Sequence, residues 1–291
     1  MFDTLLFPTD GSEGATAVFD HVLDMAAATG ATVHVINVAD TTRDSVTQIR
    51  GEVVDTLEQE GRRIAQEAAD RAADRGVETV TDVLQGEPHR TIVDYAESRD
   101  VDLVVMPTHG RRGLERVLLG STTERVVRRS EAPVLTIRPD DATVRYPYRN
   151  VLVPTDGSDC AADALSLALD IVTKEDATSL HILSVVDVTT LGVDVRADVL
   201  ADTLEEDATE IVEEAASTAA DAGVDATTDV EFGTSVARTV RSYVDDHDID
   251  LVVTGTHGRT GLDRYVLGSV ADRLIRTSPV PVLTVRSAAE S

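Results

Sequence analysis

Two kinds of hydrophobic pattern alternate along the first half of the chain. Short apolar or β-branched runs at residues 5–7 and 32–38 predict strands. Apolar residues that recur every three or four positions predict helices, one beginning at Ser12 and one over residues 45–75. Further strands are expected at 77–84, 103–106 and 134–137, with helices that begin at Pro88 and Ser121. This alternation predicts an α/β fold, a parallel sheet with helices on both faces.

The second half of the chain repeats the first. Pro-Thr-Asp-Gly-Ser at residues 8–12 recurs at 154–158, and Thr-His-Gly-Arg at 108–111 recurs at 256–259. Leu-Gly-Ser at 119–121 and Pro-Val-Leu-Thr at 133–136 also recur, and the offset changes only from 146 to 148 residues. We therefore expect two tandem domains, at 1–139 and 150–291, joined by a linker at 140–149. Each would hold a five-stranded, mostly parallel sheet.

Acidic and glycine-rich segments follow the strands at the places where parallel sheets bind ligands. Asp10 and Asp156 come just after the first strand of each copy, and glycines follow the fourth strand before helices that open at Ser121 and Ser269. Such sheets bind ligands beyond the carboxyl ends of their strands. Glycines and a helix N-terminus can hold an anion through backbone N–H groups and the helix dipole. The sequence therefore predicts an anion site at this edge in each copy.

The net charge of the chain excludes some classes of binding partner. With 53 acidic and 26 basic residues, its formal net charge is −27. Such a chain repels phosphate backbones and anionic lipid surfaces, so we expect neither nucleic acid nor a membrane as a partner. Lys174 is the only lysine and has no glycine-rich loop, which excludes P-loop chemistry. The single cysteine and the lack of a visible signal peptide or membrane-length apolar run predict a cytoplasmic protein.

The glycine motif after the fourth strand resembles the ATP-binding signature of the universal stress protein family, Gly-x2-Gly-x9-Gly-Ser/Thr. The second copy carries this signature in full, at Gly255, Gly258, Gly268 and Ser269. The first copy carries its later positions, at Gly110, Gly120 and Ser121. In the first copy, Pro107 stands where the first glycine should be and lacks a backbone N–H, while the second copy has Ala271 where the first has the hydroxyl of Thr123. Because water can replace a hydroxyl at a phosphate but cannot relax the proline backbone, we expect the second copy to bind more tightly. The resemblance extends over essentially the whole chain and is to the two-domain members of the family.

The resemblance implies Rossmann-like domains of the adenine nucleotide alpha-hydrolase type that bind ATP, with or without Mg²⁺. Asp10 and Asp156 would lie near the ribose and any phosphate-bound Mg²⁺, and Val38 and Val185 would contact adenine through backbone groups. The glycine loops would surround the phosphates, and Ser121 or Ser269 would bond a phosphate oxygen. The remaining implied contacts are Pro8, Thr9, Met106, Arg111, Thr122 and Thr123 in the first copy, and Pro154, Thr155, Thr256, His257, Arg259 and Val270 in the second.

Several of these residues have a structural alternative. Asp10 and Asp156 could only cap the helices that follow them, and the glycines could only form turns. His109 and His257 recur without a serine or carboxylate at triad-like spacing, so we interpret them as loop structure. Three further residues are interpreted as structural: His34, His181 and Cys160. No group of His, Cys or carboxylate residues has zinc-like spacing.

Three functions remain open at this point. The favoured one is a regulatory module that binds an adenine nucleotide, ATP or AMP, during a stress response. A weak ATPase or phosphotransferase could use the same pocket, but phosphoryl transfer needs positioned positive charge and a group that orients the nucleophile. The chain offers a few arginines and the aspartates for these roles. The third function is a scaffold that has lost its nucleotide.

The whole chain suggests two more expectations. Its acid excess, its single lysine and its 3% aromatic content resemble proteins from salt-in extreme halophiles, the alternative being a strongly acidic protein of a mesophile. Family members pair through their last strands, so we expect residues 133–138 and 281–286 to pair within the chain as a pseudo-twofold dimer. A homodimer of whole chains is a further option.

Overall fold

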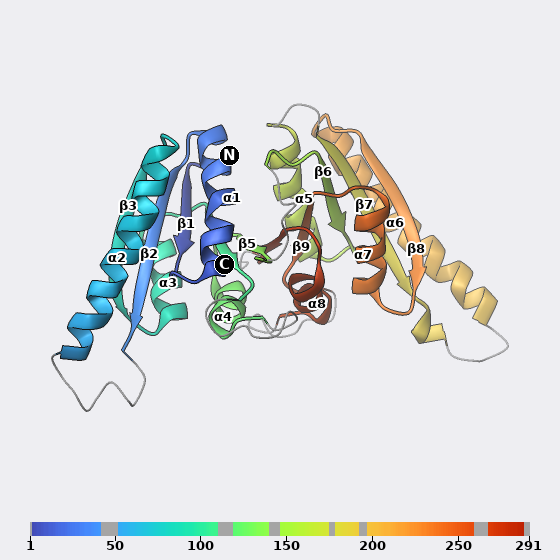
Figure 1. Ribbon diagram of the computed structural model, residues 1–291. Coiled ribbons are helices and arrows are strands. Elements are labelled where there is room, and N and C mark those ends of the chain that lie inside the picture. Colours follow the sequence, from blue (N-terminus) through green and yellow to red (C-terminus); the bar gives the residue numbers. More distant parts are fainter. Residues whose placement is uncertain are drawn as a thin grey trace. The chain divides into compact units, whose positions relative to one another are not determined.

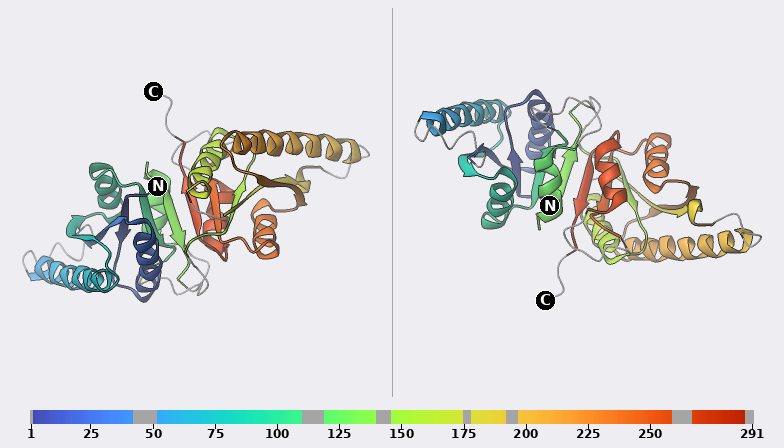
Figure 2. Two further views of the ribbon diagram at one scale, coloured as in Figure 1. Left: turned by 90° about the horizontal axis from the view of Figure 1, so that it is seen from above. Right: turned by 90° about the horizontal axis from the view of Figure 1, so that it is seen from below.

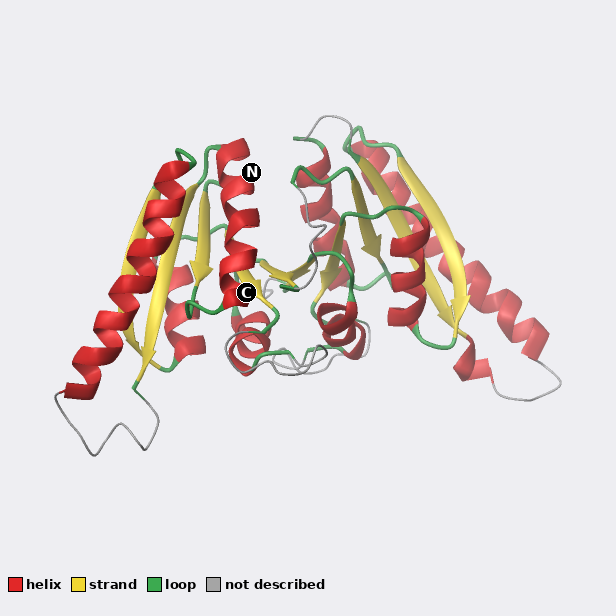
Figure 3. Cartoon of the chain, viewed as in Figure 1, coloured by secondary structure: helices red, strands yellow, loops and turns green. Residues whose placement is uncertain are grey.

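The computed structural model describes residues 2–41, 52–109, 119–139, 146–174, 178–191, 197–258 and 267–287, with the backbone alone at 52–55, 190–191 and 197–201. The chain divides into two compact units, Met1–Tyr146 and Pro147–Ser291. In both units, strands alternate with helices along the chain (Figures 1 and 3). This is the α/β fold that the hydrophobic pattern predicted.

The first unit contains nine described elements. In chain order they are β1 (Thr4–Pro8), α1 (Glu13–Thr29), β2 (Thr32–Asp40), α2 (Glu52–Asp74), β3 (Thr79–Gly86), α3 (Pro88–Ser98), β4 (Leu103–Pro107), α4 (Ser121–Arg129) and β5 (Val134–Ile137).

The second unit repeats this order and adds one short 3₁₀ helix, η1, among its described elements. They are β6 (Asn150–Pro154), α5 (Asp159–Val172), β7 (Ser179–Asp187), η1 (Val188–Leu191), α6 (Ala197–Asp221), β8 (Ala226–Gly233), α7 (Val236–Asp246), β9 (Leu251–Gly255), α8 (Ser269–Thr277) and β10 (Val282–Val285).

Each unit has a five-stranded parallel sheet with the same topology. The strand order is β3-β2-β1-β4-β5 in the first unit and β8-β7-β6-β9-β10 in the second. The first strand of each unit therefore lies between the second and the fourth; Leu5, for example, pairs with Val33 on one side and Leu103 on the other. The winding of the chain reverses at this central strand, which creates a switch point where ligands of parallel sheets bind.

Helices cover both faces of each sheet, and the core lies between them. In the first unit, α1 and α2 lie on one face, where Arg75 pairs with Asp24, and α3 and α4 lie on the other (Figure 2). In the second unit, α5 and α6 share one face, and α7 and α8 share the other. The central strands are buried on both sides, which explains why β1, β4, β6 and β9 are short continuous apolar runs instead of alternating patterns.

The starts of the helices agree closely with the sequence prediction. Ser12 is the N-cap of α1 and accepts a hydrogen bond from the N–H of Ala15 at 3.2 Å, and Pro88 and Ser121 begin α3 and α4. Hydroxyl caps and proline are local signals that can be identified without tertiary information, and this explains the agreement.

Other boundaries differ from the prediction. The strand expected at 77–84 begins instead at Thr79, because the N–H of Val77 bonds the carbonyl of Ala72 at 3.0 Å and so closes the end of α2. Its apolar side chain is buried against that helix end, which is a common contact beyond a C-cap. The second strand runs on to Asp40, two residues past the expected end. The expected helix at 45–75 is α2, and residues 45–51 lie outside the described residues.

Among the described residues, no helix combines the length and the apolar character needed to cross a lipid bilayer.

Candidate functional site

The second unit has a cavity at the carboxyl edge of its sheet. Its volume is about 390 Å³, within the usual range for small-molecule sites. Seven elements reach it: the ends of β6, β7 and β9, one face of α6, and the starts of α5, α7 and α8. The strand ends and turns contribute Pro154, Thr155, Asp156, Leu183, Ser184, Val185, Val186, Asp187, Thr254, Gly255, His257 and Gly258. The helices contribute Ser158, Ala161, Leu204, Asp207, Ala208, Ile211, Val236, Ser269, Val270 and Ala271, with Gly268 just before α8.

Two glycines allow backbone segments to approach each other closely at this cavity. A Cβ placed on Gly258 would lie 2.3 Å from Oδ2 of Asp156, so the loop after β9 passes directly over that carboxylate. A Cβ placed on Gly255 would lie 2.7 Å from Sγ and 2.8 Å from the carbonyl oxygen of Cys160. Gly258 therefore allows the loop to approach the carboxylate, and Gly255 allows β9 to pack against the start of α5.

The N-terminus of α8 is prepared to hold an anion. The N–H groups of Ser269, Val270 and Ala271 are in the first turn of the helix, where no carbonyl of the helix itself can accept from them. The N-cap residue is Gly268, which has no side chain that could accept from them instead. All three residues line the cavity. The Gly268 N–H bonds the carbonyl of Thr256 at 2.7 Å, which fixes the helix start against the loop. Backbone N–H groups and the helix dipole together attract negative charge here.

Three carboxylates also line the cavity. Asp156 accepts hydrogen bonds at Oδ1 from the N–H of Ser158 at 3.1 Å and from its hydroxyl at 2.6 Å. Asp187 accepts from the hydroxyl and the N–H of Thr189, and these bonds lower the pKa of Asp187 below its ordinary value. Asp207 reaches the cavity from α6. An anionic ligand is therefore expected to place its negative charge at the α8 terminus and its neutral or hydroxyl-bearing part towards the carboxylates.

The first unit carries the same turn geometry. Oδ1 of Asp10 accepts from the N–H of Ser12 at 3.0 Å, as Asp156 does from Ser158. The N–H of Gly120 bonds the carbonyl of Thr108 at 2.7 Å, which repeats the contact that fixes α8. The hydroxyl of Thr123 is buried and donates to the carbonyl of Pro107 at 2.9 Å. The two units thus share one backbone plan at the site and differ in side chains.

The comparison with known families decides the affiliation of the chain. A model of the universal stress protein family matches residues 1–138 and, a second time, residues 147–286. The chain belongs to the universal stress protein family. It is therefore a tandem member, with one family domain in each compact unit.

The chain is also similar to individual members of the family. A universal stress protein of Mycobacterium bovis is 32% identical over 238 residues, which are 79% of this chain and 78% of that protein. The crystal structure of a universal stress protein from Archaeoglobus fulgidus has a TM-score of 0.76 at 22% identity and covers 99% of this chain and 100% of its own, so it shows the shared fold. A universal stress protein solved in complex with cAMP is 26% identical over 48% of this chain and 99% of its own, with a TM-score of 0.39.

The family motif in the second domain falls largely on the cavity. Ten residues expected from the sequence line it: Pro154, Thr155, Asp156, Val185, Gly255, His257, Gly258, Gly268, Ser269 and Val270. Thr256 is buried beneath the loop, where its N–H bonds the carbonyl of Val285 at 2.9 Å. Arg259 lies outside the described residues.

The family motif in the first domain is described except at two positions. Pro8 ends β1, Thr9 and Asp10 follow it, Val38 lies in β2, and Met106 lies in β4. Gly120, Ser121, Thr122 and Thr123 form the start of α4. Gly110 and Arg111 lie outside the described residues.

Sequence reasoning missed the contribution of the long helix. Leu204, Ala208 and Ile211 line the cavity, and their spacing of four and then three residues places them on one face of α6. The hydrophobic periodicity predicts the corresponding helix in the first copy, at 45–75, but it does not indicate that the apolar face of such a helix lines a cavity. Asp207 lies between Leu204 and Ala208 and also lines the cavity, but α6 carries many exposed acidic residues, so the sequence holds no clear signal for this contribution.

The recurring histidines of the second strands belong to a network away from the cavity. Nδ1 of His34 lies 3.0 Å from the hydroxyl of Tyr95, which donates to Asp82 at 2.7 Å. The second domain repeats it, with His181 at 3.1 Å from the Tyr243 hydroxyl. Burial is the main cause that lowers the pKa of both histidines and raises the pKa of both tyrosines. These groups tie β2 to β3 and α3, and β7 to β8 and α7, as expected for structural histidines.

His109, His257 and Cys160 lie at the loops and the first helix turn. Nδ1 of His257 is 3.0 Å from the hydroxyl of the preceding Thr256, and His109 repeats this contact with Thr108 at 3.2 Å. The sulfur of Cys160 is buried and donates to the carbonyl of Val285 at 3.3 Å. All three residues thus contact the backbone or hydroxyl groups that shape the loop, in accord with the structural interpretation.

Proposed function

We propose that the second domain binds an adenine nucleotide, with ATP as the leading ligand, and that the chain is a nucleotide-binding regulatory module. One observation carries the proposal. The cavity joins the Pro-Thr-Asp turn, the end of β7 and the uncapped N-terminus of α8 in one space of about 390 Å³. Apolar, hydroxyl-binding and anion-binding surfaces are the three that a nucleotide requires.

The residues divide naturally among the parts of a nucleotide. The end of β7, at Val185, and the apolar face of α6 at Leu204 and Ile211 suit the base. The carboxylate of Asp156 suits a ribose hydroxyl, because a carboxylate is an acceptor for O–H donors. The N–H groups of Ser269 and Val270 suit the phosphates, which are then held without lysine.

Mg²⁺ would accompany the phosphates and would not occupy a protein cage of its own. Within the described ranges, no group of three or more His, Cys, Asp or Glu side chains is placed to hold a metal. Mg²⁺ typically binds through one or two carboxylates together with substrate phosphates and water. Asp156 fits that role, since it is the carboxylate that the glycine loop approaches most closely.

The regulatory function is favoured over turnover because the described site offers little for phosphoryl transfer. Such transfer needs positive charge and a group that orients the attacking nucleophile. Oδ1 of Asp156 is already bonded twice by Ser158, and the described cavity lining contains no lysine or arginine. A nucleotide that is held but not consumed can act as a signal through the conformation it stabilises.

The proposal is tested on the intact chain, purified in high salt. Mass spectrometry of the ligand released on denaturation identifies what is bound, and calorimetric titration of the emptied protein with ATP, AMP and cAMP ranks the candidates. Release of inorganic phosphate from ATP is measured in the same samples. Saturable binding without turnover supports the proposal, steady turnover would assign an ATPase, and the absence of binding to all three nucleotides would leave the scaffold function.

A further inference from the structure

The two domains differ where α2 and α6 meet the ends of their strands. The offset between copies is 147 residues in β2 and β7, and again in β3 and β8, on either side of these helices. By this offset Asn37 corresponds to Ser184, and Gly61 corresponds to Ala208. Ser184 and Ala208 line the open cavity of the second domain. Their counterparts in the first domain instead touch each other.

Asn37 spans the space between two strand ends and a helix. Its side chain is only 8% exposed, and its Nδ2 donates to the carbonyl of Thr9 at 2.8 Å. On the other side, its Oδ1 lies 2.5 Å from the place that a Cβ on Gly61 would occupy. Even an alanine at Gly61 would overlap with the amide, so the helix and Asn37 are in direct contact. The amide therefore joins β1, β2 and α2 where Ser184 faces a cavity.

A second contact closes the same region. Ile64, the counterpart of Ile211, is 5% exposed. Its Cδ1 lies 2.7 Å from the position of a Cβ on Gly11, the residue that follows Asp10. Ile64 thus covers the turn that would face the ribose. Two contacts along α2, three residues apart, place this helix directly on the strand ends of the first domain.

We propose that the two nucleotide sites are unequal, and that Asn37 with Gly61 closes the first one. The inference rests on the proposed function of the second domain and adds a stoichiometry of binding, one nucleotide for each chain. A nucleotide in the first domain would have to displace α2 and break the bond between Asn37 and Thr9. Loss of that hydrogen bond weakens binding by roughly tenfold, and displacement of α2 weakens it further, so ATP at concentrations that saturate the second site should leave the first site empty.

Exchange of the paired residues between the domains tests the proposal. The variant Asn37→Ser/Gly61→Ala gives the first domain the pair that the second domain holds, and Ser184→Asn/Ala208→Gly does the reverse. Each pair already occurs in this fold, and circular dichroism melts verify that each variant is folded. The single variant Asn37→Ser, which keeps the helix glycine, is the fallback if the double variant does not fold. Native mass spectrometry and calorimetry with ATP count the bound nucleotides.

The expected counts are one for the unaltered chain, two for Asn37→Ser/Gly61→Ala and zero for Ser184→Asn/Ala208→Gly. Two equal sites in the unaltered chain would overturn the inference and leave the proposed function intact. A folded Asn37→Ser/Gly61→Ala or Asn37→Ser chain that still binds only one nucleotide would overturn it as well. If no chain binds nucleotide, the proposed function fails, and the inference fails with it.

Discussion

Single side chains at the cavity hold the backbone segments of the second domain in place. Oδ1 of Asp156 is occupied by the backbone and hydroxyl of Ser158, while Oδ2 lies directly beneath the glycine loop at Gly258. The carboxylate therefore caps its own turn and also faces the site. The structure shows the capping role that the sequence leaves open for this aspartate, and the proposed contact with a ligand would use the other oxygen of the same group.

The first prediction concerns the glycine above that carboxylate. In Gly258→Ala, the new Cβ would fall 2.3 Å from Oδ2 of Asp156 and must displace the loop or the carboxylate. Loss of a hydrogen bond to a charged group costs about 1.5–3 kcal/mol, so ATP affinity should fall about ten- to a hundredfold. Calorimetric titration measures the change. Gly110→Ala at the matching position of the first copy is the control and should bind as the unaltered chain does; equal affinities in all three proteins would contradict the prediction.

The second prediction concerns a buried histidine of the first domain. Burial lowers the pKa of His21 to about 4, while an unfolded histidine titrates near 6.5. As the pH falls below about 6.5, His21 becomes protonated in the unfolded chain but stays neutral in the folded chain. The free energy of unfolding therefore declines until about pH 4. The full loss is about 3 kcal/mol. The difference between the free energies of unfolding at pH 7 and pH 5, measured by urea melts, should contain most of this loss.

The matched control for this prediction is His21→Leu, since Leu167 stands at the equivalent place in the second domain. His34 and His181 have lowered pKa values too and remain in the variant, so the difference between the two proteins isolates His21. The variant should lose less stability on acidification. Parallel declines in the two proteins would show that His21 does not titrate as described.

At the scale of elements, the N-caps of the first helices couple stability to the site. Oγ of Ser158 accepts from the N–H of Ala161 at 3.3 Å and donates to Asp156. Oγ of Ser12 accepts from the N–H of Ala15, and this is its counterpart in the first domain. One hydroxyl in the second domain therefore both starts a helix and orients a carboxylate of the cavity.

The third prediction separates these two roles. Ser158→Ala and Ser12→Ala should each destabilise their own domain by about 1 kcal/mol, the usual cost of a lost cap. Only Ser158→Ala should also weaken ATP binding, because Asp156 loses the hydroxyl that holds it. Denaturant melts and calorimetric titration of both variants give the two quantities. A variant Ser12→Ala that weakened binding to the same extent would contradict the assignment of the site to the second domain.

The elements also show which parts of the structure could be predicted from sequence. The repeat, the parallel sheets and the helix starts follow from periodicity and local caps, so the pattern was sufficient for them. The turn at Val77 that delays β3 is local, but it leaves no clear mark in the hydrophobic pattern because Val77 is apolar and buried. The cavity face of α6 depends on contacts distant in sequence, which no local pattern contains. The difference between Asn37 in the first copy and Ser184 at the equivalent place in the second is visible in the sequence. Its effect on the space at the strand ends depends on how closely Gly61 approaches Asn37, which the sequence does not show.

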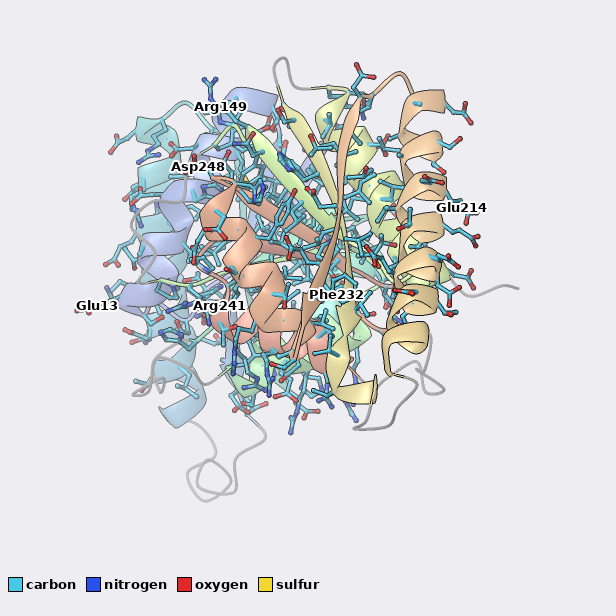
Figure 4. All side chains as sticks on the ribbon, turned by 90° about the vertical axis from the view of Figure 1, so that its right-hand side faces the viewer. Glu13, Arg149, Glu214, Phe232, Arg241 and Asp248 are labelled. Carbon is cyan, nitrogen blue, oxygen red and sulfur yellow. The ribbon has the colours of Figure 1, made fainter. Side chains whose placement is uncertain are left out.

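At the scale of the whole molecule, charge is concentrated on particular helices. The segment Ala197–Asp221, which forms α6, has nine acidic residues and no basic one. Figure 4 shows the carboxylate of Glu214 directed outwards from this helix, away from the sheet. By contrast, α2 places Arg62 and Arg63 among its carboxylates and forms ion pairs along its surface. The repulsion within the folded chain should therefore be greatest along α6.

The fourth prediction is that salt stabilises the protein. The Debye length falls from about 10 Å at 0.1 M salt to about 3 Å at 1 M, so molar KCl screens the repulsion of a chain with net charge −27. The melting temperature should rise between 0.1 M and 3 M KCl. Glu213→Gln/Glu214→Gln, which removes two charges from α6, should reduce this rise. A melting temperature that does not change over this range would reject the halophilic interpretation.

The expected pairing of the last strands, at 133–138 and 281–286, stays a prediction. It is tested by expressing the two halves separately and mixing them. Association of the halves would support it, and halves that remain monomeric with no affinity for each other would contradict it.

The close contact between Cys160 and Gly255 gives the protein a chemical reporter of its own. The chain has one thiol, Cys160, which is 3% exposed, lies in the first turn of α5 and packs against the ends of β9 and β10. A thiol reagent can reach it only when these elements separate, whereas opening of the first domain leaves it covered. The labelling rate of the unaltered chain therefore measures the opening of the second domain alone. A bound nucleotide should slow that rate in proportion to its occupancy.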